Sequence, residues 1–274
     1  MRTLARAVGS ADIGGEPLPS VFRTFDINKV VIRRAEVSMI AGTPGAGKST
    51  LALAVALRSK VPTLYISADT NAHTMAMRLL SMITGQAQSL VEKYLIDNVE
   101  ESRKIINQHS NHIFWSFESA PTLRDLDLEC AAFEELWGCP PTLIVVDNLM
   151  DIAGDSGDEF GAMRANIKEL KYLARDTNAA VLILHHTKES YIGNPCQPRS
   201  ALQGMVAQLP ALILTVGSNE PGFLAVAPVK NRYGKADQTG DTNFWLKFNP
   251  EFMEIADIPE SANTAWNRNE QTNV

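Results

Sequence analysis

One short segment constrains the fold of this 274-residue chain more than any other feature of its sequence. Residues 42–49 read Gly-Thr-Pro-Gly-Ala-Gly-Lys-Ser and fit the pattern G-x-x-x-x-G-K-[ST]. The apolar run Val37–Ala41 comes before this segment and predicts a short buried strand. The apolar run Ser49–Ser59 includes its last residue and predicts a buried helix. A strand that leads through a glycine-rich loop into a helix is typical of α/β folds with a parallel sheet.

The residue types of this loop indicate phosphate binding. Glycines let backbone N–H groups turn inward and approach phosphate oxygens, and the following helix presents its positive N-terminal end to the anion. Lys48 can reach the β- and γ-phosphates of a nucleotide, and Ser49 can coordinate Mg²⁺. The alternative is a glycine-rich turn that binds nothing. We therefore expect ATP and Mg²⁺ as cofactors, with these nucleotide-binding residues: Gly42, Thr43, Pro44, Gly45, Ala46, Gly47, Lys48, Ser49 and Thr50.

A second metal ligand is predicted where the apolar run Leu143–Val146 ends at Asp147. A carboxylate at the carboxyl end of a buried strand, beside a phosphate loop, is placed for the second protein contact to Mg²⁺. The alternative is an aspartate that only caps a turn. With a phosphate loop upstream, the metal role is favoured, and Ser49 and Asp147 form the predicted metal site.

Apolar strand-like runs alternate with helical patterns along most of the chain. Such strands, with helices between them, predict one domain in which helices cover both faces of a mostly parallel sheet. Further strands are expected at Thr63–Ser67, Ile113–Phe117, Leu143–Val146, Val181–Leu184, Leu212–Val216, Phe223–Val229 and in a final pair near 244–256. Helices are expected over 71–84, closed by Gly85, and after capping boxes at Thr122–Asp125 and at Ser156 and Glu159. The last two helices carry apolar stripes, made of Leu126, Cys130, Phe133 and Trp137 in one and of Phe160, Met163, Ile167, Leu170 and Leu173 in the other.

Composition narrows the class of protein. The net charge of −6 argues against broad, nonspecific binding of nucleic acid, although a narrow basic channel in an assembled ring remains compatible with it. No run approaches the ~18 apolar residues of a membrane span, and the N-terminal residues lack the apolar stretch of a signal peptide. Three scattered cysteines suggest free thiols in a reducing compartment. We expect a cytoplasmic protein without a membrane partner.

The ordered motifs resemble the ATPase core of RecA-like proteins, and most closely the motor domain of DnaB-type replicative helicases. The resemblance runs from about residue 30 to 250 and covers AGTPGAGKST, YISADTNAHTMAMRLL, LIVVDNLMD, LILHHTKES and KNRYGK, in the family's order. It implies a RecA-like P-loop NTPase fold over residues 29–258. Residues 1–28 are then expected to be an N-terminal arm or linker, and 259–274 a flexible C-terminal tail.

The resemblance also implies catalytic roles. In this family a glutamate after the second strand activates the attacking water, and Asp69 stands at that place. Its side chain is one methylene shorter, which predicts slow hydrolysis unless the backbone shifts; the alternative role is a helix N-cap. A polar sensor of the γ-phosphate ends a later strand, where this chain has His185 and His186. We expect His186 to be the sensor; the alternative is one core and one surface histidine.

Lys230 and Arg232 resemble the family's K-x-R finger, which reaches the nucleotide of a neighbouring subunit in a ring. A cation that arrives from outside stabilises charge that develops during phosphoryl transfer. The alternative is a solvated basic turn. Two connections, 151–159 and 187–204, would face the central channel. The first is acidic, and the second offers three candidate contacts to nucleic acid, Lys188, Tyr191 and Arg199.

We therefore expect a ring-forming, hexameric, DNA-dependent ATPase, a DnaB-type helicase or translocase that moves along single-stranded DNA in replication or recombination. Residues 1–28 are too short for the N-terminal domain of full replicative helicases, which suggests a minimal motor of prokaryotic, viral or plasmid origin. Three alternatives stay open. The first is a RecA-like protein that coats DNA without unwinding it, and the second is a signalling ATPase or autokinase. The third is an ATP-regulated nuclease built on Asp69, Asp147, Asp151, His185 and His186 around divalent metal.

Overall fold

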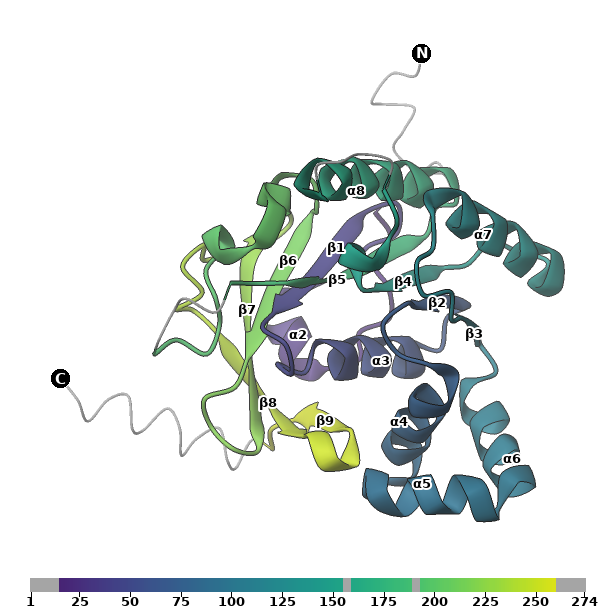
Figure 1. Cartoon of the computed structure of the whole chain (residues 1–274). Helices are drawn as coiled ribbons and strands as arrows, with labels where there is room; N and C mark the ends of the chain where they lie inside the picture. The colour runs from purple at the N-terminus through teal and green to yellow at the C-terminus, as the bar shows by residue number, and fades with distance from the viewer. Residues whose placement is uncertain (1–14, 155–158, 189–192, 260–274) are drawn as a thin grey trace.

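A sheet of nine strands runs through the part of the chain that the computed structural model describes, residues 15–154, 159–188 and 193–259 (Figure 1). In spatial order the strands are β3-β2-β4-β5-β1-β6-β7-β8-β9. Neighbours from β3 to β6 are parallel, and β7, β8 and β9 continue the sheet in antiparallel fashion. The expected α/β fold with a mostly parallel sheet is confirmed. The strands are β1 Val37–Gly42, β2 Thr63–Ser67, β3 Ile113–Ser116, β4 Leu143–Asp147, β5 Ala180–His186, β6 Leu212–Gly217, β7 Phe223–Asn231, β8 Phe244–Asn249 and β9 Glu254–Asp257.

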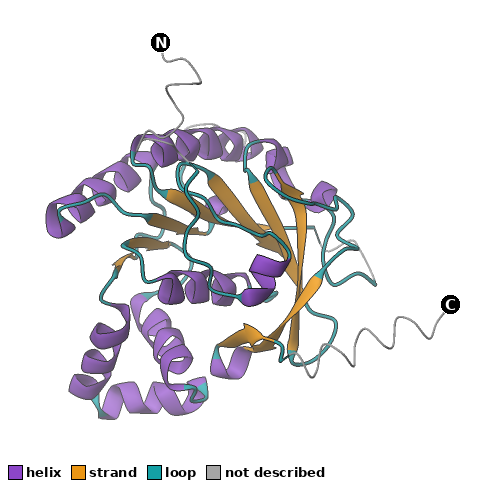
Figure 2. Ribbon diagram, turned by 180° about the vertical axis from the view of Figure 1, so that it is seen from behind, coloured by secondary structure: helices purple, strands orange, loops and turns teal. Residues whose placement is uncertain are grey.

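Helices cover both faces of this sheet, because nearly every side chain of its central strands is apolar and needs cover (Figures 1 and 2). Successive side chains of a strand point to opposite faces. In β1, Ile40 joins the core that includes α3, whereas Met39 and Ala41 join the core that includes α7 and α8. The bounds of these helices are α3 Lys48–Ser59, α7 Leu123–Trp137 and α8 Glu159–Asp176.

Helix α7 begins at the capping box that the sequence predicts. The Thr122 hydroxyl accepts from the Asp125 N–H at 3.2 Å, and the Asp125 carboxylate accepts from the Thr122 N–H at 2.8 Å. Leu126, Cys130 and Phe133 are buried, but Trp137 is 39% exposed and stacks on Phe133 at 5.4 Å. The expected stripe therefore ends one turn early, because the helix itself ends at Trp137 and is capped by left-handed Gly138.

Helix α8 buries the middle of its expected stripe, with Met163, Ile167 and Leu170 at most 3% exposed. Phe160 departs from the expectation, since it lies in the first turn and is 47% exposed. The capping box expected at Ser156 and Glu159 lies outside the described side chains.

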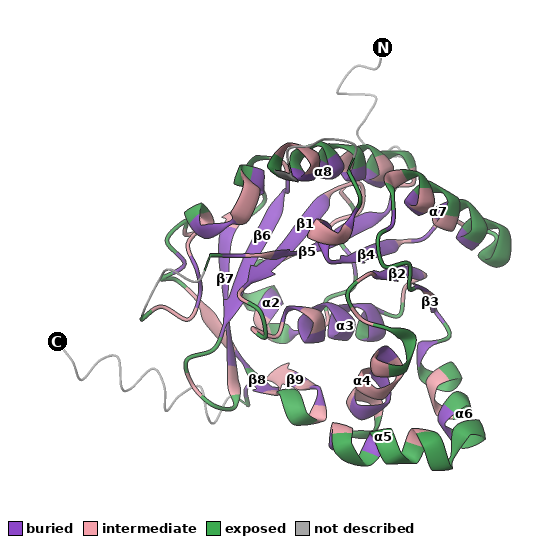
Figure 3. Ribbon diagram, in the orientation of Figure 1, coloured by how far each residue is buried: buried purple, intermediate pink, exposed green. Residues whose placement is uncertain are grey.

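An excursion of three helices separates β2 from β3: α4 Ala72–Thr84, α5 Gln88–Asp97 and α6 Val99–Ser110. The sequence predicts only α4. Helix α5 buries Val91 alone among its residues, and α6 buries two serines, so both helices are largely exposed (Figure 3). The Gln88 side chain donates to the carbonyl of Pro250 at 2.8 Å and ties α5 to the connection between β8 and β9.

Residues 15–28, the described part of the segment expected to be an N-terminal arm or linker, pack on the domain. Leu18, Phe22 and Phe25 are each at most 8% exposed and belong to the core on the α3 side. The short helix α2, Arg23–Ile27, carries Phe25. The rest of the expected arm and nearly all of the expected tail lie outside the described residues. None of the helices in the described ranges has both the length and the apolar character needed to cross a bilayer.

Phe133→Ala tests the packing of α7. Phe133 is fully buried, so its truncation should lower the free energy of unfolding by about 3–5 kcal/mol through lost transfer energy and a residual cavity. Leu136→Ala is the matched control on the same helix, because Leu136 is 67% exposed and its truncation should change stability by less than about 0.5 kcal/mol. Denaturant unfolding of both variants measures the difference. Equal losses would contradict the assigned face of α7.

Candidate nucleotide-binding site

The carboxyl ends of four parallel strands meet at one edge of the sheet. Gly42, the last residue of β1, pairs with His186 of β5, and Ser67 of β2 pairs with Asp147 of β4. The N–H of Ala68 donates to the Asp147 carbonyl at 2.9 Å, so Asp69 follows directly after this contact. A cavity of about 330 Å³ lies at this edge. Its walls include residues 44–50, Asp69, Arg78, Gln88, Asp147, Asn148, His186, Phe248, Pro250 and Met253.

Two glycines of the loop are required by its surroundings. A Cβ on Gly42 would lie 2.6 Å from the carbonyl oxygen of Val216, which is shorter than any real contact. Gly47 has φ +88°, which disfavours L side chains, and its Cβ would meet the Phe248 ring at 3.0 Å. Both ends of the loop are therefore packed tightly. Its middle, Pro44 and Gly45, is exposed and lines the cavity.

Lys48 is the first residue of α3 and is only 7% exposed. Its Nζ donates to the carbonyls of Gly42 at 3.0 Å and Thr43 at 2.9 Å. Burial lowers the pKa of Lys48, while the nearby charges of Asp147 and Asp69 raise it. The ammonium is thus held inside the loop that it closes, where phosphate oxygens can replace the two carbonyls as acceptors.

Asp147 ends β4 with 5% of its surface exposed. Burial raises the pKa of its carboxyl, and hydrogen bonds from Ser49 and Tyr65 lower it again. The Tyr65 hydroxyl donates to Oδ2 of Asp147 at 3.3 Å. The positive charge of Arg78 also lowers the pKa of this carboxyl. A hydroxyl and a carboxylate side by side are oxygen donors that suit Mg²⁺, so Ser49 and Asp147 fit the ion. Bound there, Mg²⁺ would neutralise charge on phosphate oxygens.

Asp69 is exposed at the rim of the same cavity. The alternative role as an N-cap is wrong, because α4 is capped by Asn71, whose side chain accepts from the N–H of Thr74 at 2.9 Å. The carboxylate of Asp69 is therefore not engaged in starting the helix.

The two histidines at the end of β5 have different surroundings. His185 is fully buried, its Nε2 lies 2.9 Å from the carbonyl of Gln203, and burial lowers its pKa to about 4. His186 is half-buried and lines the cavity. Burial, followed by the charge of Lys48, lowers the pKa of His186, while Asp151 and Asp69 raise it. Of the pair, His186 is the one that faces the cavity, on the side where the expected sensor belongs.

Arg78 is a residue of this cavity that sequence reasoning missed. It lies on α4, and its Nη1 donates to the Thr70 hydroxyl at 3.3 Å. Its positive charge lowers the pKa of both Asp147 and Tyr65. The sequence does contain a feature that could have indicated this residue, because Arg78 is the only lysine or arginine in the otherwise mainly apolar segment 72–84. The lining of the cavity thus contains two cations, Lys48 and Arg78, and two carboxylates, Asp69 and Asp147.

Lys230 and Arg232 lie away from this cavity. Lys230 pairs with Ile213 near the amino end of β6, whereas the phosphate loop follows the carboxyl end of β1. Its Nζ donates to the carbonyls of Ala207 at 2.8 Å and Gln208 at 2.7 Å. Arg232 forms an ion pair with Glu36 at 3.1 Å. Neither cation can reach the phosphate loop of the same chain without a large rearrangement.

A groove of about 1000 Å³ opens beside Lys230, and Arg199 lines it as well. Burial, followed by the charges of Arg232, Arg199 and Lys171, lowers the pKa of Lys230 to about 8. Arg199, an expected contact to nucleic acid, therefore lies beside Lys230. Lys188 is exposed, and its N–H donates to the Ala201 carbonyl at 2.9 Å. Tyr191, the third expected contact to nucleic acid, lies outside the described residues.

The metal cluster expected by the nuclease alternative is not formed. Within the described ranges, no three His, Cys, Asp or Glu side chains gather closely enough to hold a metal ion. His185, one member of the expected set, is buried against the Gln203 carbonyl.

Comparison with known proteins identifies relatives of the whole domain. A family model described as an AAA domain matches residues 26–190. The Gene 65 protein of Mycobacterium phage L5 is 34% identical over 257 residues, which cover 89% of this chain and 94% of the phage protein. The DNA repair protein RadA of Treponema pallidum is 25% identical over 217 residues; the match covers 76% of this chain but 38% of RadA.

Two solved structures are similar in fold. One is an isolated ATPase domain, which matches with a TM-score of 0.77 at 15% identity, over 93% of this chain and 96% of that one. The other, a DnaB-like replicative helicase, matches with a TM-score of 0.75 at 15% identity, over 93% of this chain and 65% of the helicase chain. These matches confirm the expected RecA-like core, similar to that of DnaB-type helicases.

Arg78→Gln tests the missed cation of the cavity. Removal of its charge should weaken binding of an anionic fluorescent ATP analogue, measured in the presence of Mg²⁺, about 10-fold, the lower end of what a charge-assisted hydrogen bond contributes. Arg103→Gln is the matched control, because Arg103 lies exposed on α6 and pairs with Glu100 at 2.8 Å. Fluorescence titration measures both affinities. An unchanged affinity for Arg78→Gln would remove this residue from the site.

Proposed function

This chain belongs to the AAA-domain family, and on that premise we propose that it is an ATPase that binds ATP with Mg²⁺ at the edge cavity. The observation that carries the proposal is the meeting of Lys48, Ser49, Asp69, Asp147 and His186 around one cavity. Lys48 binds the β- and γ-phosphates, and Ser49 and Asp147 hold the metal. Asp69 orients the attacking water, and His186 senses the γ-phosphate.

The finer proposal is a ring-forming motor of the DnaB type. The position of Lys230 and Arg232, away from their own cavity, supports a role at the nucleotide of a second copy. ATP would then bind between subunits of a hexamer, and an isolated subunit would have an incomplete site. Likeness to a replicative helicase and to a DNA repair protein supports single-stranded DNA as the partner that the ring moves along. The mycobacteriophage relative supports a viral origin and action in the bacterial cytoplasm.

A second candidate is a RecA-like protein that coats DNA and hydrolyses ATP slowly. Asp69 favours it, because the shorter side chain reaches less far into the cavity than a glutamate would. The two candidates differ in turnover: a motor requires hydrolysis stimulated by DNA, whereas a coat requires only ATP-dependent binding.

ATP hydrolysis with and without single-stranded DNA is the decisive measurement. The motor proposal predicts a DNA-stimulated rate that Lys48→Ala abolishes. Asp69→Glu should raise kcat about 10-fold, which is less than the roughly 100-fold or more that a well-placed general base contributes, because Asp69 already supplies part of that effect; Asp69→Ala should remove most activity. A gel of the recovered DNA accompanies each assay. No stimulation, with intact DNA, would refute the motor and leave the coat or a signalling ATPase; shortened DNA would indicate a nuclease.

The pKa of Lys230 gives the finger proposal a pH signature. Its pKa of about 8 means that the cation is present below this pH and is lost as pH rises through it. DNA-stimulated kcat/KM for ATP, which reports ionisations of the free enzyme, should therefore decline above about pH 8, and Lys230→Arg should move the decline to higher pH, because a guanidinium stays charged. The pH dependence of kcat/KM for both proteins measures this shift. Superimposable profiles would show that Lys230 does not act through its charge.

A further inference from the structure

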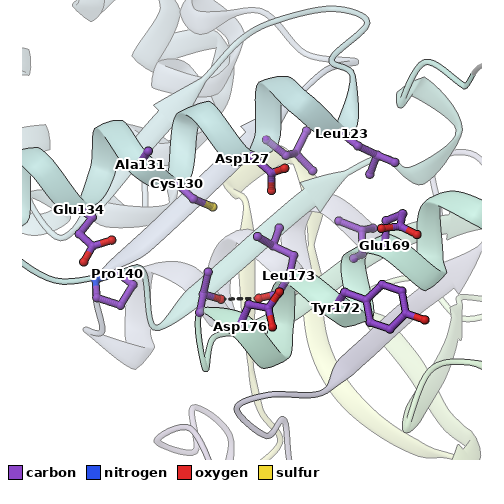
Figure 4. Close-up of a pocket in the computed structure, with 13 residues that line it drawn as sticks. Leu123, Asp127, Cys130, Ala131, Glu134, Pro140, Glu169, Tyr172, Leu173 and Asp176 are labelled. Carbon is purple, nitrogen blue, oxygen red and sulfur yellow. Dashed lines mark hydrogen bonds between the residues drawn. The ribbon is translucent and has the colours of Figure 1, made fainter.

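A groove between α7 and α8 has a chemical character opposite to that of the nucleotide cavity. Its volume is about 400 Å³, and residues of α7 and α8 line it (Figure 4). These two helices pack on the face of the sheet that α3 does not cover. Leu126 and Leu170 are fully buried beneath it, and Leu123 and Leu173 are half-buried along it. Four exposed carboxylates surround this apolar floor: Asp127, Glu134, Glu169 and Asp176.

No lysine or arginine is among the described residues that line this groove. Phosphate groups would be repelled, so the groove does not suit nucleotide or nucleic acid. An apolar floor with an acidic rim suits a peptide segment in which apolar side chains alternate with cations.

The described chain begins at one end of this groove. The N–H of Gly15 donates to the carbonyl of Arg34 at 2.8 Å. Arg34 in turn donates through Nε to the carbonyl of Asn178 at 2.8 Å. Asn178 directly follows Thr177, which lines the groove beside Asp176. Gly15 is therefore anchored close to the groove's Asp176 end, and residues 1–14 start from there.

Residues 1–14 have the composition that this groove requires. Arg2 and Arg6 alternate with Leu4 and Val8, and the one acidic residue, Asp12, lies next to the anchor. Fourteen residues can span up to about 46 Å when extended. The groove runs along α8 from Glu169 to Thr177, about 12 Å of helix. Residues 2–8 can therefore cover it while 9–14 serve as the connection.

We propose that residues 1–14 bind in the α7–α8 groove of their own chain. Leu4 and Val8 cover the apolar floor, and the arginines pair with the acidic rim. The anchor sets the direction: Arg6 meets Asp176 and Glu134 near Gly15, and Arg2 reaches Glu169 farther along. A short tether raises the effective concentration of the segment to the millimolar range, so that weak individual contacts suffice to fill the groove.

Disulfide trapping tests this docking. Cys130 and Cys139 are first replaced by alanine, which leaves buried Cys196 as the remaining native thiol. Leu4→Cys, between the two arginines, is then combined with Ala131→Cys, which lines the groove, or with Ala132→Cys, an equally exposed neighbour on α7 that does not line it. Because a disulfide forms only when Cα atoms come within about 7 Å, the 4–131 pair should oxidise at least about 10-fold faster than the 4–132 pair.

Charge-reversal variants, high salt and the size of the cross-linked product complete the test. Arg2→Glu with Arg6→Glu should remove the preference for position 131, and so should about 1 M salt, which screens the rim. The product should be a cross-linked monomer on a non-reducing gel, with ATP hydrolysis unchanged before oxidation. Equal rates at 131 and 132 would overturn the proposal. A dimeric product would overturn it as well, because the groove would then be filled by a second copy.

Discussion

The in-register pairing of parallel strands is the constraint on which the rest of this structure depends. Hydrogen bonds of the ladder align the ends of β1 with β5 and of β2 with β4. The side chains that follow these ends come from distant parts of the chain, yet they open onto one cavity. Slippage of one residue would turn each strand's apolar side chains to the other face. Burial of both faces therefore fixes the site as firmly as it fixes the core.

Charge within the cavity is arranged so that each buried ion has a partner. Lys48 and Asp147 are both largely removed from water, a state that is costly for isolated charges. Backbone carbonyls hold the ammonium, while Ser49, Tyr65 and Arg78 stabilise the carboxylate. All of these partners belong to the sheet, its loop or a helix that packs on it. Contacts within the protein thus hold these charged groups in place, which reduces the entropy cost of binding a ligand beside them.

The sequence predicts an element correctly where its apolar pattern agrees with residues that mark where the element begins or ends, such as a capping box. The second strand was predicted residue for residue, and the capping box at Thr122 begins α7 as expected. It failed for α5 and α6, because helices that bury so little lack a continuous apolar stripe. It also missed the packing of residues 15–28, where Phe22 and Phe25 anchor a segment that has no sustained period. Residues that follow a strand could be placed in the site, whereas Arg78, on one face of a helix, could not.

The antiparallel strands β7 and β8 connect two places that the proposed function keeps chemically separate. At one end, β7 carries Lys230, and Arg232 follows directly after the strand. At the other, Phe248 of β8 packs so closely on Gly47 that a single added carbon would touch its ring. Strand β7 pairs with β6 from Ala225 to Asn231 and with β8 from Phe223 to Val226, so a displacement at the cations would be carried along the sheet toward the phosphate loop. In the proposed ring, the hold of each subunit on its own nucleotide would then depend on how firmly it contacts the nucleotide of its neighbour.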